Sequence, residues 1–169
     1  MYFDLPFELY LDLTATCNLN CSFCMRNWKP YLRHKDRRDV IPYLKSELLK
    51  NRIPGIILTG GEPLLHPEFL PFVKFLKQNG MKVKITSNGT LLNRNMISQL
   101  KDLDVDEIQV SLHTFDKRRS LQLYGKRGVV GKVWEALKLL SEYEVPFSTK
   151  TTITSVNAGD IDFIIRKVL

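Results

Sequence analysis

The chain has 169 residues, of which 44% are hydrophobic, enough for one compact core and too few for two comfortable domains. No apolar run approaches the roughly 20 residues that span a bilayer, and no Gly/Ser-rich or Pro-rich linker divides the sequence. The formal net charge is +7, but no nucleic-acid-binding motif accompanies it. We expect one cytoplasmic domain over residues 1–169, with neither a membrane nor a nucleic acid as partner.

The first third of the chain predicts strand, helix and strand. Period-two alternation of apolar and polar residues predicts a strand at 9–14. Helical spacing predicts a helix that is capped by Asp39 and ends near Asn51. A continuously apolar run at 56–58 predicts a strand buried on both faces. The basic segment Lys29–Arg38, which contains interspersed aspartates, is expected to be a solvated loop.

The same alternation continues to the end of the chain. Strands are predicted at 81–86, 108–112 and 147–153, and helices at 67–79, 93–100, 130–140 and 161–168. Strand–helix units with short connections imply right-handed crossovers and a parallel sheet. The pattern alone leaves open whether this sheet is doubly wound or curved like part of a barrel. In both cases functional residues are expected at the carboxyl ends of the strands.

All three cysteines of the chain, Cys17, Cys21 and Cys24, lie within eight positions directly after the first predicted strand. Thiolates suit iron–sulfur clusters, and a [4Fe-4S] cluster ordinarily takes four of them. Three cysteines leave one iron open to bind a substrate or cofactor. The cysteines are therefore candidate metal ligands and catalytic residues.

Two alternatives to a cluster exist for these cysteines. A structural zinc site needs four ligands, and the nearby candidate for the fourth is His34, but the spacing matches no common zinc finger. A disulfide framework is disfavoured because the number of cysteines is odd. A cluster is the favoured interpretation, and a zinc-bound interaction module is the remaining alternative.

Small polar or acidic motifs follow the next three predicted strands. Gly60-Gly61-Glu62-Pro63 follows strand two; adjacent glycines allow a close approach of the backbone, and the carboxylate can receive an ammonium group. Ser87-Asn88 follows strand three, and Ser111 lies near the end of strand four. Each motif alone could be an ordinary turn or a backbone contact. Because all lie at one edge of the predicted sheet, they are candidate ligand contacts.

In this order, the cysteine spacing and the Gly-Gly-Glu motif resemble the radical S-adenosylmethionine (radical SAM) superfamily, from about Glu8 to Asn157. The resemblance implies a partial, open TIM-like barrel of about five β/α units, a [4Fe-4S] cluster and SAM. It implies that Cys17, Cys21 and Cys24 bind the cluster. The residues that would contact SAM are Phe23, Gly60, Gly61, Glu62, Pro63, Ser87, Asn88, Ser111 and Arg127.

The resemblance also implies a reaction. An external one-electron reductant, flavodoxin- or ferredoxin-like, would reduce the cluster. SAM would then be cleaved to methionine and a 5′-deoxyadenosyl radical, which abstracts hydrogen from a peptide or small-molecule substrate. The segments 110–113, 125–131 and 151–157 look most like the larger peptide- or cofactor-modifying members.

Relatives usually carry six β/α units, and the larger members add a C-terminal domain with further clusters. We therefore expect a core that lacks the last unit and depends on a partner chain or a dimer to cover its open edge. A core that binds the cluster and SAM without independent turnover is the second functional hypothesis. Among individual residues, His66 is expected to cap a helix, Ile153 to lie in the core, and Asn157 to fall in the region that lines the adenine in relatives.

Overall fold

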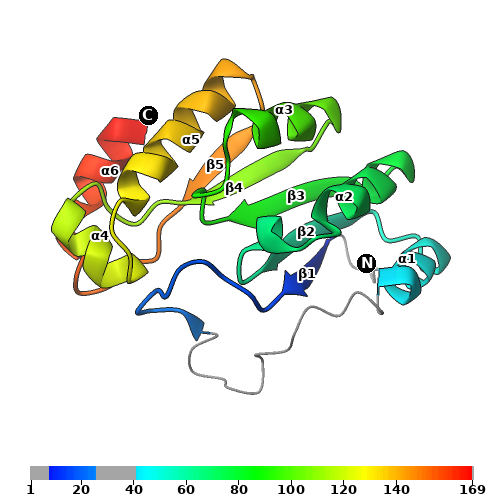
Figure 1. Cartoon of the computed structure of the whole chain (residues 1–169), viewed down its shortest axis with the longest axis horizontal. Coiled ribbons are helices and arrows are strands. Elements are labelled where there is room, and N and C mark those ends of the chain that lie inside the picture. The colour runs from blue at the N-terminus through cyan, green and yellow to red at the C-terminus, as the bar shows by residue number, and fades with distance from the viewer. Residues whose placement is uncertain (1–7, 26–40, 169) are drawn as a thin grey trace, which may run out of the picture.

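The structure, a computed structural model, describes residues 8–25 and 41–168 (Figure 1). It contains a five-stranded parallel sheet in the order β1-β2-β3-β4-β5. The strands are β1 (Leu9–Thr14), β2 (Gly55–Gly60), β3 (Lys82–Ser87), β4 (Glu107–Ser111) and β5 (Phe147–Lys150). All five strands predicted from the sequence are confirmed, although β5 ends three residues early. Asp39 and the basic segment Lys29–Arg38 lie outside the described residues.

Helices connect the strands. They are α1 (Ile41–Lys50), α2 (Phe69–Gln78), α3 (Arg94–Asp102), α4 (Lys117–Tyr124), α5 (Val129–Glu142) and α6 (Ile161–Val168), with short 3-10 turns η4 (Pro63–Leu65) and η5 (Ala158–Asp160). The five predicted helices are confirmed. Asn93 caps α3 by accepting a hydrogen bond from the Met96 amide at 2.9 Å. His66 also acts as expected, since its Nδ1 accepts the Glu68 amide at 3.1 Å before α2 begins.

Helix α4 was missed by the sequence analysis. Basic residues occupy its first turn, where they oppose the helix dipole, and few apolar residues mark its buried side. Two capping signals were nevertheless present. The Asp116 carboxylate accepts the amides of Arg118 and Arg119, each at 2.8 Å, and Gly125 ends the helix at a φ of 67°.

The core lies between the sheet and the helices that run along one face of it, α2, α3 and α5 (Figure 1). In β3 and β4, buried residues alternate with half-buried ones, so one face of each strand packs on the helices. Strand β2 is buried over Gly55–Leu58, as the apolar run predicted. Within the described residues β1 and β5 each pair with one neighbour, so the sheet is open. No described helix has both the length and the apolar character of a membrane span.

The segments that follow β4 and β5 are joined by the fully buried side chain of Asn157. Its Nδ2 donates to the carbonyl oxygens of His113 at 2.8 Å and Thr152 at 2.9 Å. Its Oδ1 accepts the amide of Thr154 at 2.7 Å and the hydroxyl of the same residue at 3.0 Å. Asn157 therefore satisfies the backbone of two loops at the carboxyl edge of the sheet.

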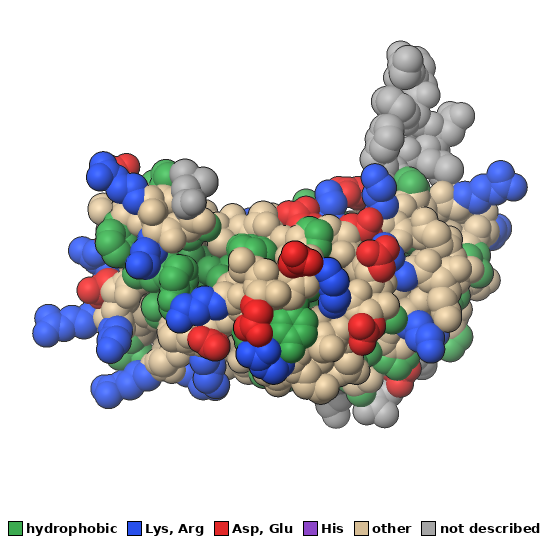
Figure 2. Space-filling model, turned by 90° about the horizontal axis from the view of Figure 1, so that it is seen from above, with side chains coloured by type: hydrophobic (Ala, Val, Ile, Leu, Met, Phe, Trp, Pro, Cys, Tyr) green, Lys and Arg blue, Asp and Glu red, His purple; other side chains and the backbone are tan. Residues whose placement is uncertain are grey.

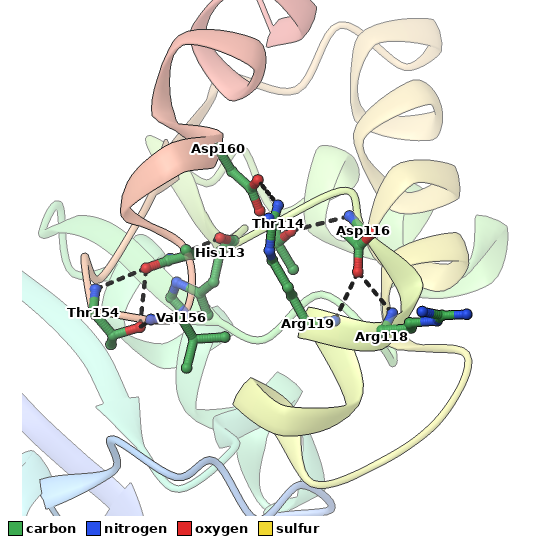
Figure 3. Close-up of polar contacts among 9 residues, drawn as sticks. His113, Thr114, Asp116, Arg118, Arg119, Thr154, Val156 and Asp160 are labelled. Atoms are coloured by element: carbon green, nitrogen blue, oxygen red, sulfur yellow. Dashed lines mark hydrogen bonds and ion pairs between the residues drawn. The ribbon is translucent and has the colours of Figure 1, made fainter.

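A second polar cluster consists of Thr114, Asp116, Arg119 and Asp160 (Figure 3). The Thr114 hydroxyl donates to Asp160 at 2.5 Å and accepts the Asp116 amide at 3.0 Å. Arg119 forms an ion pair with the other oxygen of Asp160. These contacts hold the start of α4 against the start of α6.

The prediction that Ile153 lies in the core is wrong. Its side chain is 64% exposed, because β5 ends at Lys150 and the chain then turns outward. Ile153 instead lines a hollow of about 350 Å³ with residues of β5 and the apolar side of α6.

We predict that Asn157→Ala destabilises the protein by about 2–4 kcal/mol, because it removes four hydrogen bonds and leaves buried backbone groups without partners. Chemical denaturation measures this change. Glu135→Ala, on the exposed side of α5, is the control and should alter stability by less than about 0.5 kcal/mol. A loss for Asn157→Ala as small as that of the control would contradict the role given to Asn157.

Candidate functional site

The cysteine loop, residues 15–25, is held at its start and near its centre by backbone hydrogen bonds. At its start, the Gly61 amide donates to the Thr14 carbonyl at 2.7 Å and the Glu62 amide to that of Thr16 at 2.8 Å. Near its centre, the Asn20 and Ser22 amides donate to the last carbonyls of α4 at 3.1 and 2.9 Å. The loop therefore crosses the carboxyl edge of the sheet from β1 to α4 (Figure 1).

Gly60 and Gly61 allow a close approach of backbone to backbone. A Cβ atom at Gly60 would lie 2.4 Å from the Thr14 carbonyl oxygen, and one at Gly61 would lie 2.2 Å from that of Thr16. Gly60 also has a φ of 134°, which disfavours other residues. Gly60 therefore makes room for the end of β1 and Gly61 for the cysteine loop, while their predicted contact with a ligand stays a prediction.

Glu62 is fully buried, and its carboxylate joins the ends of β2 and β3. Oε1 accepts the Ser87 hydroxyl at 2.9 Å and the Leu64 amide at 3.3 Å, and Oε2 accepts the Asn88 amide at 2.8 Å. Burial raises the pKa of Glu62 to about 7, although the hydrogen bonds act in the opposite direction. At neutral pH this group is therefore poised between its neutral and ionised forms. Its neighbour Pro63 is buried at the first position of η4.

A ring of side-chain hydrogen bonds ties the cysteine loop to the turn after β3. Asn88 Nδ2 donates to Asn18 Oδ1 at 2.9 Å, Asn18 Nδ2 donates to the Thr90 hydroxyl at 2.8 Å, and this hydroxyl donates to Asn88 Oδ1 at 2.6 Å. Asn88 Nδ2 also lies 3.9 Å from Cys17 Sγ. The predicted residue Asn88 is thus beside a cysteine, and Asn18 and Thr90 are partners that the sequence analysis missed.

None of the three cysteines forms a disulfide; Cys17 is exposed, and Cys21 and Cys24 are half-buried. Burial, followed by the charges of Cys17 and Cys24, raises the pKa of Cys21 to about 12, and burial also raises that of Cys17. Because metal coordination deprotonates a thiol, these raised pKa values do not exclude ligation by iron.

Within residues 8–25 and 41–168, no three Cys, His, Asp or Glu side chains converge on a single metal ion. The thiols of a [4Fe-4S] cluster bind separate irons and need not meet at one point. The donor set therefore fits a cluster. His34, the fourth ligand of the zinc alternative, lies outside the described residues.

Phe23 packs on buried aromatic residues beneath the cysteine loop. Its ring lies 4.6 Å from that of His113 in an edge-to-face arrangement, and His113 lies 5.2 Å from Tyr124. His113 Nδ1 accepts the Thr152 amide at 3.0 Å, and burial lowers its pKa to about 4, with a smaller contribution from Lys150. Neutral His113 therefore supports Phe23 and was missed as a site residue.

Two further predicted residues, Ser111 and Arg127, form no hydrogen bond or ion pair with the cysteine loop among the described residues. Ser111 is half-buried at the end of β4, one strand from Ser87. Arg127 lines a hollow formed by α4, α5 and α6, and no contact between it and the cysteine loop is seen among the described residues, so its role stays a prediction. The adjacent Lys126 does reach the loop, where its Nζ donates to the Asn18 carbonyl at 3.4 Å.

The sequence from residue 11 to 167 matches the model of the Radical SAM superfamily. The chain belongs to the radical SAM superfamily. This family is associated with SAM and a [4Fe-4S] cluster, which agrees with the order of the cysteine loop and the Gly-Gly-Glu motif along the sheet edge.

Curated radical SAM relatives include proteins that act on different kinds of molecule. A probable GTP 3′,8-cyclase of Sulfurisphaera tokodaii is 30% identical over 94% of this chain and 51% of its own length. The sporulation killing factor maturation protein SkfB of Bacillus subtilis is 29% identical over 96% of this chain and 40% of its own length. The chain thus spans about half the length, or less, of these relatives.

Solved structures confirm the fold. Native anSMEcpe with bound AdoMet superposes with a TM-score of 0.79 at 20% identity, over 95% of this chain and 48% of that one. Streptococcus suis SuiB bound to precursor peptide SuiA gives a TM-score of 0.67 at 21% identity, over 96% of this chain and 37% of that one. The open parallel sheet is therefore the partial barrel of the radical SAM fold, as the resemblance implied.

The raised pKa of Glu62 predicts a pH-dependent stability of the cluster-free protein. The protonated carboxyl favours folding below about pH 4.5, and this contribution is lost as pH rises through about 7. Between pH 5 and 8, we expect the unfolding free energy of the wild type to fall relative to that of Glu62→Gln by up to about 3 kcal/mol.

Denaturant titrations of both proteins at several pH values measure this difference. Any titration of His113 occurs in both proteins and cancels. Parallel pH profiles for the two proteins would show that Glu62 ionises normally.

Proposed function

We propose that this chain is the core of a radical SAM enzyme that reductively cleaves SAM in order to abstract hydrogen from a peptide or small-molecule substrate. The observation that carries the proposal is the position of the cysteine loop. Its three thiols, Cys17, Cys21 and Cys24, lie on one loop that is hydrogen-bonded to the ends of β2 and β3. In this proposal the cysteines hold three irons of a [4Fe-4S] cluster and leave the fourth to the amino and carboxylate groups of SAM.

When bound and reduced, the cluster would supply the electron that cleaves SAM to methionine and a 5′-deoxyadenosyl radical. The protein's own task is to orient SAM and to exclude water. Phe23 supplies an apolar wall for the adenine, and Ser87, Asn88 and Ser111 supply polar groups at the strand ends. Asn88 is well supported in this role because it already lies 3.9 Å from Cys17 Sγ.

Glu62 is proposed to receive the ammonium group of SAM. Its pKa of about 7 means that a neighbouring positive charge would favour the ionised form and drive a proton off the carboxyl. The hydrogen bonds from the Ser87 hydroxyl and the Asn88 amide fix the position of this carboxylate. For the carboxylate of SAM, Lys126 is better placed than Arg127, since it already reaches the cysteine loop.

The substrate class stays broad. Support for a peptide comes from the maturation protein SkfB and from SuiB, which was solved with a precursor peptide, while the GTP 3′,8-cyclase relatives support a small molecule. We propose an external flavodoxin- or ferredoxin-like reductant and a cytoplasmic location, where thiols stay reduced for cluster assembly.

A specific observation favours a second candidate, a core that binds the cluster and SAM but needs a further chain segment or partner for turnover. Strand β5 pairs with one neighbour among the described residues, and beside it lies the apolar hollow lined by Ile153. An open edge of this kind leaves the proposed radical accessible from one side until a partner chain, a dimer or another domain covers it.

The cysteine assignment predicts that Cys17→Ala, Cys21→Ala and Cys24→Ala each abolish cluster binding and SAM cleavage. The measurement is anaerobic reconstitution with iron and sulfide, followed by visible absorbance and by assay of 5′-deoxyadenosine after addition of dithionite and SAM. A cluster without 5′-deoxyadenosine would favour the second candidate. Zinc without a cluster would favour an interaction module, and retained cleavage in the triple variant would reject the assignment.

Glu62→Gln should retain the cluster and weaken SAM binding by about 10- to 100-fold, because it removes a charge partner rather than an iron ligand. Equilibrium binding of SAM to the reconstituted protein measures this loss. Glu135→Gln, an exposed change on α5, is the matched control. Equal SAM affinity in Glu62→Gln and the control would exclude contact between Glu62 and the ammonium.

A further inference from the structure

A pocket of about 570 Å³ lies between α4, α5 and α6, outside the sheet edge that carries the cysteines. Phe115, Leu121, Val130 and Trp134 supply its apolar lining. Phe115 meets Trp134 edge-to-face at 5.4 Å, so two aromatic rings form a fixed wall. A volume of this size is within the usual range of about 300–1,000 Å³ for small-molecule sites.

Four cationic side chains also line this pocket, namely Lys117, Arg118, Arg127 and Lys167. No acidic residue lines it, and none of the four forms an ion pair within the part of the chain that the structure describes. Two acids near the start of α4 lie outside the lining: Asp116 accepts the amides of Arg118 and Arg119 and interacts with the charge of Arg118, and Asp160 binds Thr114 and Arg119. The positive charge around the pocket is therefore uncompensated by its own lining.

This charge is visible on the surface. In Figure 2, Lys and Arg side chains crowd the end of the molecule formed by α4, α5 and α6, and hydrophobic side chains lie among them. Lys167 lies 5.5 Å above the ring of Trp134, which places a cation directly against the aromatic wall. Apolar and cationic side chains thus lie next to one another, an arrangement that suits a ligand with a flat body and an anionic group.

Gly131 supplies an independent observation. It lies inside α5, where glycine costs helix stability relative to alanine, and apart from the adjacent residues and the nearby backbone of α5 itself nothing lies within 4 Å of the Cβ that another residue would add. Packing therefore does not require a glycine here. Because Gly131 has no side chain, it leaves space open in the pocket. Gly128 lines the same pocket.

From these observations we propose that the pocket binds an organic phosphate with a flat apolar or aromatic body, of about the size of a mononucleotide. The apolar wall of Phe115 and Trp134 receives the ring, and Arg118, Lys117 and Lys167 receive the phosphate, since guanidinium groups suit phosphate oxygens. This site is separate from the cysteine loop, and the proposal does not rest on radical chemistry.

The test uses the whole chain with Trp28→Phe, which leaves Trp134 as the single tryptophan. AMP is the probe, and adenosine and inorganic phosphate are the half-ligands. We expect AMP to change Trp134 fluorescence saturably and to bind at least tenfold more tightly than either half-ligand. Saturating SAM should leave AMP binding unchanged.

Gly131→Phe, which fills the pocket, should abolish AMP binding, whereas Gly131→Ala should retain it and raise the melting temperature. Arg118→Gln should weaken AMP binding about tenfold, and Lys132→Gln, an exposed cation outside the pocket lining, is its control. Circular dichroism checks folding. If Gly131→Phe does not fold, the pair Lys117→Gln and Arg118→Gln tests the same site.

Four results would overturn the proposal. They are the absence of saturable AMP binding, AMP binding that survives both Gly131→Phe and Arg118→Gln, equal binding of inorganic phosphate alone, and tighter binding of an acidic phenylalanine-containing peptide. SAM cleavage is assayed separately in Gly131→Phe, so loss of AMP binding with intact cleavage is distinguishable from failure of the proposed enzyme activity.

Discussion

The arrangement of the site depends on one buried carboxylate. Glu62 has no exposed surface, and an ionised carboxylate in such a place is costly unless hydrogen bonds satisfy it. The donors come from the end of β3, through Ser87 and Asn88, and from Leu64 in the turn after β2. The backbone amide of Glu62 also donates to the Thr16 carbonyl of the cysteine loop. One side chain and its own backbone thus connect three segments that are distant in sequence.

The cysteine loop is positioned by its backbone and its asparagines rather than by the thiols. Backbone bonds join it to the Gly-Gly-Glu turn and to α4, and the ring of Asn18, Thr90 and Asn88 joins it to the turn after β3. These contacts within the chain itself place the thiols at the sheet edge. Preorganised ligands lower the entropic cost of binding.

Much of the fold was predictable because its periodicity is strong. Strand β2 is a continuous apolar run, and α3 begins with an asparagine cap, so both were recognised from sequence. Helix α4 was missed because its polar residues hide its buried side, and Ile153 was misplaced because an apolar residue after a strand resembles core. The cysteines and Glu62 are predicted from motifs, whereas Asn18 and His113 act through contacts that only the folded chain creates.

The backbone bonds from Asn20 and Ser22 to Tyr124 and Leu123 set a lower limit on the length of a useful fragment. A peptide that contains the cysteines but ends before Leu123 would keep the thiols and lose both backbone bonds between the loop and α4. Gly125 adds to this limit, since a Cβ there would lie 2.5 Å from the Asn20 carbonyl oxygen. Expression trials aimed at a minimal cluster-binding unit should therefore retain α4 in full, although it lies about 100 residues from the cysteines along the chain.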